Sequence, residues 1–289
     1  MVPLMSFTPQ VAAAAPMAAL GLRLTGRRGP AATAVLASAA LGLLVRSRGV
    51  PRRQPEAGGP TLRVLTTNLL VGRADSEAVV ARVRQGDLDV LFVQELTIGA
   101  ETRLKQAGLE DLLPYAQIEH KDGGPRGSGI YARFPLSEGP PLPSTFAAQP
   151  TALLELPDGE QVERICVHPR APAMRRGGSA NWRAELAVLP APGKLPRVVA
   201  GDFNATPDHA AFRDVLRLGY ADAAIQTGTG LIRTWGRPGR DPWLTIDHVL
   251  VSRECAVLAC SVHMVPGSDH RAVYAEIRLP AAGEGGSAA

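Results

Sequence analysis

The sequence predicts an α+β fold in which two mixed β-sheets stack on each other with helices outside, preceded by a pair of hydrophobic helices. The 289 residues are 45% hydrophobic and 20% charged, which is enough for a large core and excludes a disordered or collagen-like chain. Strand-like runs are in places closely spaced and in places alternate with helical runs, and this mixture favours stacked sheets over a purely parallel sheet.

The first 48 residues predict a hydrophobic helical anchor. Residues 1–22 and 29–45 contain no charged side chain, and the basic turn RLTGRR separates them. Each run is at the short end of the ~20 residues that a membrane span needs. We therefore expect two transmembrane helices and a location at the cell membrane. A cleaved export signal ending near Ala37-Ser38-Ala39 and a soluble helical subunit are the alternatives.

The positions of the arginines give opposing indications about membrane orientation. Arg23, Arg27 and Arg28 between the two runs favour a cytoplasmic loop, which would place the globular domain outside. The four arginines after the second run favour the opposite side: Arg46, Arg48, Arg52 and Arg53. Because the uncharged start MVPLMSFTPQ does not hold the amino terminus in the cytoplasm, we expect an extracytoplasmic domain.

Residues 49–60 (GVPRRQPEAGGP) predict a linker rich in Pro, Gly and Arg, and the globular domain follows over 61–280, with 281–289 as a flexible tail. Short runs rich in apolar and β-branched residues, such as TLRVLTTN, predict strands, and longer amphipathic runs between them predict helices. In order, the first half predicts strand 61–68, helix 76–85, strand 90–95, helix 100–107 and strand 128–132.

The second half of the domain begins with a predicted β-hairpin. Its strands are 152–156 and 162–168, and the connection between them contains the turn residues Pro157-Asp158-Gly159. The elements expected after it are helix 180–189, strand 197–204, helix 209–218, strand 243–252 and strand 272–279.

Charge does not point to nucleic acid. Residues 1–60 hold seven arginines and one acidic residue, so the net charge of +4 arises there, and the remaining residues hold 24 basic and 26 acidic groups. Proteins that bind duplex DNA through its phosphates normally carry an excess of Lys and Arg. A local basic patch stays open as an alternative. Few aromatic residues are available to stack on bases, although Trp182, Trp235 and Trp243 are candidates.

Polar residues stand at the ends of the apolar strands. Asn68 closes the first strand and Glu95 the second. Asp202 and Asn204 are two residues apart after an apolar run, so both side chains leave one face of an extended segment and can act on one ligand. The other polar residues at strand ends are His168, Asp247, Asp269 and His270.

Each of these residues has a structural explanation when taken alone. An Asp or Asn at a strand end is commonly a turn former or helix cap, and a lone His is commonly a satisfied core residue. Together, carboxylates, amides and two histidines at the ends of separate strands predict a hard-oxygen metal site with proton-transfer groups.

These residues lie in motifs that resemble those of the endonuclease/exonuclease/phosphatase family over residues 61–279. The motifs occur in the family's order: TTNLL, QEL, SGIYARFPL, VHP, GDFNATP, TIDHVLVS and SDHRAV. The resemblance implies a four-layer α/β/β/α sandwich, with a divalent-metal phosphoesterase site at one edge.

The resemblance also implies a role for each matching residue. Glu95 would be the main Mg²⁺ ligand, with Asn68 nearby and Asp269 binding directly or through water, and Mn²⁺ is a possible substitute. Asp202 would orient or deprotonate the attacking water, and Asn204 would donate a hydrogen bond to a phosphate oxygen.

Two histidines complete the implied site. His270, oriented by Asp247, would transfer a proton or contact the phosphate, and His168 would protonate the leaving oxygen. Which group is base and which is acid stays open. Leu70 departs from the abasic-site endonucleases, which have an Asp at this position, and this weakens a resemblance to that branch.

The sequence therefore predicts a membrane-anchored, Mg²⁺-dependent enzyme that hydrolyses phosphodiester or phosphomonoester bonds by attack of an activated water. Its expected substrate is either nucleic acid or a phospholipid head group, and no obligate protein partner is inferred. The alternative is a non-catalytic binding or scaffolding module that retains the fold.

Overall fold

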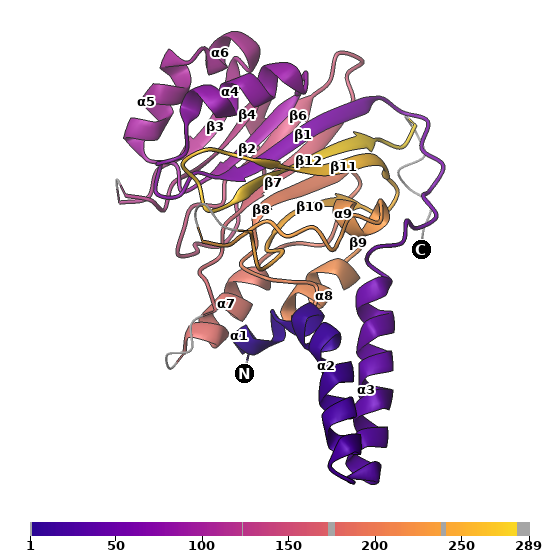
Figure 1. Cartoon of the computed structure of the whole chain (residues 1–289). Helices are drawn as coiled ribbons and strands as arrows, with labels where there is room; N and C mark the ends of the chain where they lie inside the picture. Colours follow the sequence, from indigo (N-terminus) through magenta and orange to yellow (C-terminus); the bar gives the residue numbers. More distant parts are fainter. Residues whose placement is uncertain (1, 123, 173–176, 238–240, 282–289) are drawn as a thin grey trace.

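The strands of the globular domain form two stacked, mixed sheets (Figure 1). The computed structural model describes residues 2–122, 124–172, 177–237 and 241–281. Within them, the first sheet contains β1 (Thr61–Asn68), β2 (Val90–Gln94), β3 (Tyr115–Glu119), β4 (Ser128–Ala132), β11 (Ala256–Met264) and β12 (Arg271–Arg278). The second contains β5 (Leu136–Glu138), β6 (Thr151–Glu155), β7 (Gln161–Val167), β8 (Arg197–Asp202), β9 (Tyr220–Asp222) and β10 (Asp247–Ser252). The strand orders are β11-β12-β1-β2-β4-β3 and β5-β6-β7-β8-β10-β9.

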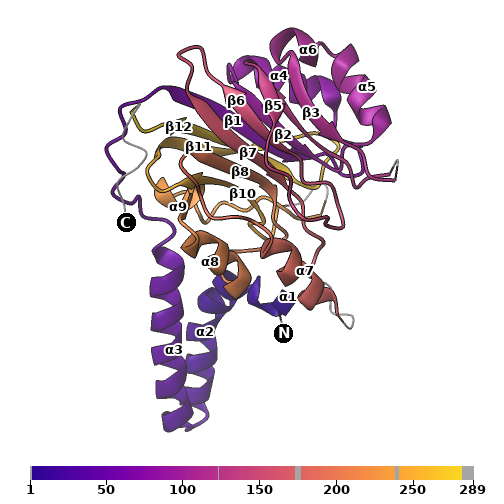
Figure 2. The same cartoon turned by 180° about the vertical axis from the view of Figure 1, so that it is seen from behind.

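Helices cover the outer face of each sheet, as the opposite views in Figures 1 and 2 show. On the first sheet, Val79 and Val83 of α4 pack with Leu65 and Leu91. The helices on this side are α4 (Ser76–Gln85), α5 (Ile98–Gln106) and α6 (Leu109–Leu112). The second sheet is covered by α7 (Gly178–Leu186) and α8 (Ala210–Arg217), and the short α9 (Ala223–Gln226) precedes β10.

The main core lies between the two sheets. Leu62 and Val64 of β1 pack there with Cys166 and Val198 of the second sheet, whereas Leu65 faces the helices. Since both faces of β1 are covered, six of its eight residues are buried, polar ones included. The predicted four-layer α/β/β/α sandwich is confirmed.

The amino-terminal helices extend away from the sandwich (Figure 1). After the short α1 (Val2–Met5), α2 (Thr8–Leu24) and α3 (Arg28–Arg46) lie side by side, and we call these two the helical pair. Of the described helices, α3 alone is long and apolar enough to cross a membrane. The 17-residue α2 contains Pro16, and its expected role as a second span stays a prediction.

The chain between the helical pair and β1 lies against the domain. The Arg52 amide donates to the Gln226 carbonyl oxygen (2.9 Å), and the Gln54 side chain accepts a hydrogen bond from the Val257 amide (3.1 Å). These contacts hold residues 52–54 beside α9 and β11.

Some expected elements differ at their ends. The strand expected over 197–204 ends at Asp202, because Asn204 adopts a positive φ of 48°. The strand expected over 243–252 begins only at Asp247, since the preceding residues turn back to pair with Trp235. Four strands had no sequence prediction: β3, β5, β9 and β11.

Candidate active site

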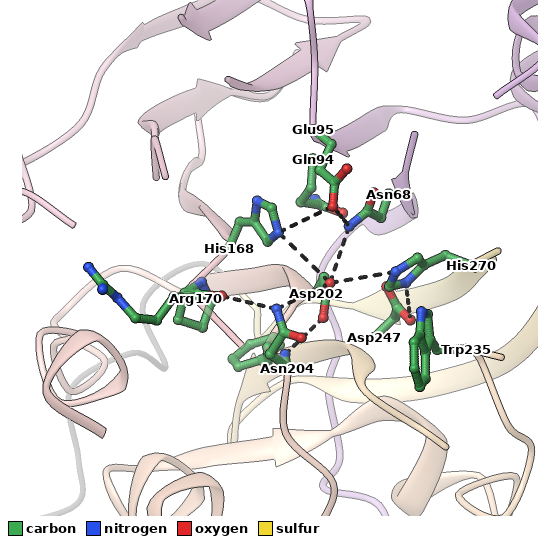
Figure 3. A network of polar contacts seen from close by, with 12 residues as sticks. Asn68, Gln94, Glu95, His168, Arg170, Asp202, Asn204, Trp235, Asp247 and His270 are labelled. Carbon is green, nitrogen blue, oxygen red and sulfur yellow. Dashed lines mark hydrogen bonds and ion pairs between the residues drawn. The ribbon is translucent and has the colours of Figure 1, made fainter. Parts of the chain in front are cut away.

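The predicted site residues meet at one edge of the sandwich. Figure 3 labels all of them except Asp269, whose Oδ1 atom lies 3.8 Å from His270 Nε2. The parallel pairs β1–β2 and β7–β8 end at this edge, and the antiparallel neighbours β10 and β12 begin there. Residues far apart in the chain are thereby brought to one place. They are Asn68, Glu95, His168, Asp202, Asn204, Asp247, Asp269 and His270.

Asn68 joins the two sheets at the site. Its Nδ2 atom donates to Glu95 Oε1 (3.1 Å) and to Asp202 Oδ2 (3.2 Å), while its Oδ1 atom accepts from the Leu70 amide (2.9 Å). The buried amide therefore holds two carboxylates close together, which would otherwise repel each other.

The Glu95 carboxylate is held by a strained turn. Glu95 has a φ of +54°, and its Oε2 atom accepts from the amide of Val71, which has a φ of +55°. Non-glycine residues rarely adopt such angles, and they persist only where the surrounding structure enforces them. Leu70 lies in the same turn with a φ of +48°.

Asp202 lies at the centre of the site. Its Oδ1 atom accepts from the Asn204 amide (2.8 Å), and Asn204 Nδ2 donates to the Pro169 carbonyl oxygen (3.0 Å). Burial, with the nearby carboxylates of Asp247 and Glu95, raises the pKa of Asp202 to about 7. Gly201 permits the close approach of β8 to β7, because a Cβ atom there would lie 2.0 Å from the Val167 oxygen.

His270 is fixed by a carboxylate on the opposite side from Asp202. Its Nδ1 atom lies 3.0 Å from both oxygens of Asp247, and its Nε2 atom lies 3.8 Å from Asp202 Oδ2. Burial alone would lower the pKa of His270, but the carboxylates of Asp247 and Asp202 raise it to about 10. The imidazole is therefore protonated at neutral pH.

His168 lies on the other side of Asp202. Its Nε2 atom is 3.9 Å from Asp202 Oδ2 and 3.9 Å from Glu95 Oε1, and its backbone amide donates to Gln149 Oε1 (3.2 Å). Burial lowers the pKa of His168. Asp202 thus lies between a neutral and a protonated imidazole.

One carboxylate oxygen of Asp269 accepts a hydrogen bond and the other does not. Trp235 Nε1 donates to Asp269 Oδ2 (3.1 Å), whereas the buried Oδ1 atom has no hydrogen-bond partner among the described residues. The His270 Nε2 atom lies 3.8 Å from this oxygen, too far for a hydrogen bond. A buried carboxylate oxygen without a hydrogen bond is costly unless a cation binds it. Trp235 is a site residue that the sequence offered only as one of three candidates to stack on bases.

The oxygen-rich donor set fits a divalent metal ion. The carboxylates of Glu95 and Asp269 and the amide of Asn68 are the hard ligands that Mg²⁺ prefers. Among the described residues, the group of acidic and His side chains whose ligand atoms lie within 4.8 Å of one another is a different set, Asp202, Asp247 and His270. In that group both oxygens of Asp247 already contact His270, so it resembles a proton-transfer network more than a metal cage.

The site opens into a pocket of about 1120 Å³. Glu95, His168, Asp202 and His270 line it, and so do residues that the sequence did not single out: Ser6, Phe7, Arg126, Phe146 and Arg170. These had no recognisable signal, because none of them lies at the end of an apolar strand.

Comparison with known families decides the classification. The sequence model of the Endonuclease/Exonuclease/phosphatase family matches residues 65–270, which includes every predicted site residue. The chain belongs to this family. Members of the endonuclease/exonuclease/phosphatase family are generally metal-dependent hydrolases of phosphoester bonds. A comparison with curated proteins finds no match.

Solved structures of the endonuclease/exonuclease/phosphatase family share the fold of this chain. A family protein from Beutenbergia cavernae is 20% identical and matches 76% of this chain and 72% of its own, with a TM-score of 0.57. D. rerio TDP2, solved with a single-strand DNA product, is 17% identical over 75% and 98% of the chains (TM-score 0.58). An AP endonuclease from Archaeoglobus fulgidus is 16% identical over 74% and 98% (TM-score 0.58).

Proposed function

We propose that the chain is a Mg²⁺-dependent phosphoesterase that hydrolyses its substrate by attack of an activated water. The observation that carries this proposal is the position of Asp202. Its carboxylate is held by Asn68 and lies between the imidazoles of His168 and His270, in an open pocket beside Glu95. A base, a cationic group and hard-oxygen ligands thus face one volume, which is the arrangement that phosphoester hydrolysis needs.

Glu95 and Asp269 would hold the metal ion, and Asn68 would keep Glu95 in place beside it. When bound, the ion supplies Lewis-acid stabilisation of charge on the phosphate. Mn²⁺ would substitute, because it accepts the same oxygen ligands.

Asp202 would accept the proton of the attacking water. Its pKa of about 7 is near the value at which a general base works best at neutral pH. Asn204, whose amide already lies beside Asp202, would donate a hydrogen bond to a phosphate oxygen as negative charge develops there.

The two histidines flank Asp202 and would contact the phosphate and the leaving oxygen. His270 carries a proton at neutral pH, so it would contact the phosphate as a cation and give its proton to the leaving oxygen; Asp202, 3.8 Å from His270 Nε2, would then pass it the proton taken from water. His168 would donate a hydrogen bond from Nε2 to the same oxygen. Asp247 would set the orientation of the His270 ring.

Two observations bear on substrate and location. The similarity to D. rerio TDP2, which was solved with a single-strand DNA product, favours a nucleic acid substrate. The helical pair favours a membrane-anchored enzyme with a lipid substrate, because α3 is long and apolar enough to cross a membrane.

We propose anchoring through residues 1–48, with the catalytic domain on the extracytoplasmic side. Protease treatment of intact cells tests this orientation: a domain cleaved only after lysis is cytoplasmic.

A substrate panel tests the activity. The purified full chain in detergent micelles is incubated with bis(p-nitrophenyl) phosphate, p-nitrophenyl phosphate and plasmid DNA, each with Mg²⁺ and with EDTA. We expect hydrolysis of at least one of them with Mg²⁺ and none with EDTA. A chain that hydrolyses none of these esters, nor phosphatidylinositol or sphingomyelin in vesicles, with Mg²⁺ or Mn²⁺ is a scaffolding module instead.

A further inference from the structure

The amino-terminal segment forms one wall of the active-site pocket. Ser6 and Phe7, which immediately precede α2, line the same cavity as Glu95 and His270. Ser6 is buried, with its Oγ atom 3.4 Å from His209 Nε2, and the residue Phe7 is 38% exposed. The pocket is therefore incomplete without residues that belong to the base of the helical pair.

A buried ion pair fixes the helical pair to the catalytic loop. The guanidinium of Arg48 donates to both oxygens of Asp208 (2.9 and 2.6 Å), and these side chains are 7% and 2% exposed. Asp208 follows the catalytic segment that holds Asp202 and Asn204. Bidentate pairs of this kind fix orientation as well as distance.

A second contact fixes the other helix to the domain. Gln10 in the first turns of α2 donates from Nε2 to the Trp243 carbonyl oxygen (2.8 Å). Trp243 lies four residues before Asp247. Both helices are thereby attached to the loops that carry catalytic residues.

The segments that join the helices to the domain are very short. α2 begins directly after Phe7, and Arg48 lies two residues after the end of α3. One residue spans at most about 3.6 Å, so the domain stays within about 10 Å of the helix ends. With α2 and α3 in a bilayer, the pocket wall formed by Phe7 lies at the membrane surface.

The surface around the base of the helical pair exposes apolar side chains next to arginines, since Arg233 lines the same groove and the Arg237 guanidinium lies 5.3 Å from the centroid of the Trp243 ring. Leu231 and Trp243 line the groove between the pair and the domain, and both side chains are more than a third exposed, as is that of the neighbouring Ile232. Exposed apolar side chains next to a membrane-spanning helix are typical of a surface that rests on lipid.

The rim of the pocket is amphipathic. The guanidinium groups of Arg126 and Arg170 lie 4.9 and 4.8 Å from the centroid of the exposed Phe146 ring. Elsewhere in the lining stand the apolar side chains of Phe7 and Leu244. Each guanidinium also pairs with a carboxylate, that of Arg126 with Asp122 and that of Arg170 with Glu185. The rim thus offers guanidinium N–H donors for a phosphate and apolar surface for a hydrocarbon chain.

We propose that the pocket draws its phosphate ester directly from the bilayer, that the substrate is a phospholipid, and that Phe7 contacts the apolar part of that lipid next to the ester bond. This inference rests on the proposed phosphoesterase function and on insertion of the helical pair. It deepens that function, because it names the substrate class and the direction from which the substrate enters.

Reconstituted full-length protein tests the substrate class. The chain is incorporated into vesicles of phosphatidylcholine that also contain phosphatidylglycerol, phosphatidylinositol or sphingomyelin, and ³¹P NMR follows products with Mg²⁺. Bis(p-nitrophenyl) phosphate, the dihexanoyl forms of the glycerophospholipids as monomers, and single-stranded DNA are assayed in parallel. We expect at least one long-chain lipid to be hydrolysed ~10-fold or more faster than its monomeric short-chain form, because anchoring raises the effective substrate concentration.

The outcomes separate this inference from the proposed function. If the soluble diester is hydrolysed but no vesicle lipid is, or if DNA is cleaved faster than every lipid, the lipid inference is wrong and the phosphoesterase function stands. If no ester is hydrolysed with Mg²⁺ or Mn²⁺, both are wrong.

A matched pair of variants tests the role of Phe7. Phe7→Ser removes an apolar side chain from the pocket wall, whereas Met5→Ser removes one from the same segment outside the pocket, where it is 49% exposed. We expect the ratio of lipid to soluble-diester turnover to fall on the order of fivefold in Phe7→Ser and to stay unchanged in Met5→Ser. Circular dichroism checks that both variants fold. An unchanged ratio in a folded Phe7→Ser variant overturns the proposed contact.

Discussion

His270 Nδ1 lies equally far, 3.0 Å, from the two carboxylate oxygens of Asp247. Asp247 is itself fixed in position, because its backbone amide donates to Thr234 Oγ1 (3.1 Å) and its side chain is buried. The ring of His270 is therefore held with Nε2 3.8 Å from both Asp202 Oδ2 and Asp269 Oδ1, and the Asp247 carboxylate stabilises its positive charge at Nδ1.

Loss of the Asp247 charge should weaken catalysis through His270. Asp247→Asn lowers the pKa of His270 and loosens its orientation, so we expect turnover to fall about 10–100-fold, as for other supporting carboxylates. Steady-state kinetics of the two single variants and of Asp247→Asn with His270→Ala measure the coupling. The double variant should be no slower than His270→Ala. Multiplicative losses would mean that the two residues act separately.

Removal of a proton-transfer group should abolish most activity without unfolding the domain. Asp202→Asn and His270→Ala should each lower kcat by more than ~100-fold, with Mg²⁺ saturating. Asp202→Asn keeps the size and one hydrogen-bond acceptor of the side chain, so its circular dichroism spectrum should match that of the wild type. Near-full activity in either variant would show that the proposed roles are wrong.

The loss of activity on metal removal should be reversible, and the Mg²⁺ requirement should depend on Glu95. EDTA is expected to stop turnover, and Mg²⁺ or Mn²⁺ to restore it, because the anionic phosphate cannot approach the carboxylates unless their charge is screened. Glu95→Gln should raise the Mg²⁺ concentration for half-maximal activity by about 10-fold or more. A titration of activity against Mg²⁺ measures this shift, and full turnover in EDTA would contradict it.

A buried histidine away from the pocket should make stability depend on pH. His248 Nδ1 lies 2.7 Å from Asp222 Oδ2, and its Nε2 atom lies 2.9 Å from the Ala205 carbonyl oxygen. Burial alone would lower the pKa of His248, but Asp222 raises it above the ordinary value. The contribution of this charge to stability is therefore complete below pH ~6.5 and is lost as the pH rises through the folded-state pKa.

The variant His248→Gln tests this direction of the pH dependence of stability. At pH 6 the variant should be less stable than the wild type by about 2–4 kcal/mol, and the difference should narrow as the pH rises toward 9. Chemical denaturation at several pH values measures it. His263→Gln is the control with the opposite sign, because burial lowers the pKa of His263. At acidic pH the wild type should therefore lose stability relative to the His263→Gln variant. A constant difference for His248→Gln would refute the account.

The sequence predicted the layers and the meeting of the site residues, because both follow from local patterns. Apolar strands that end in Asn68, Glu95 or Asp202 are visible in the sequence itself, and the order of the motifs pointed to the fold. The sequence did not show which hydrogen bonds these side chains make with one another. That the Asn68 amide joins Glu95 to Asp202 depends on how one sheet stacks on the other.

Other features depended on contacts that no local pattern encodes. β11, an edge strand with an alternation interrupted by a bulge after Val257, had no signal strong enough to predict it. Trp235 reaches Asp269 only because its segment pairs with Leu244 and His270. The ion pair of Arg48 with Asp208 joins residues that are 160 positions apart.

The placement of β1 has a consequence for biosynthesis. β1 lies between β2 and β12, and Thr61 near its start is paired with Arg278 at the end of β12. The ribosome completes β12, which ends at Arg278, 210 residues after β1, which ends at Asn68. The helical pair therefore leaves the ribosome long before the first sheet can close, so an anchored chain would wait at the membrane with β1 half-paired until its last strand is made.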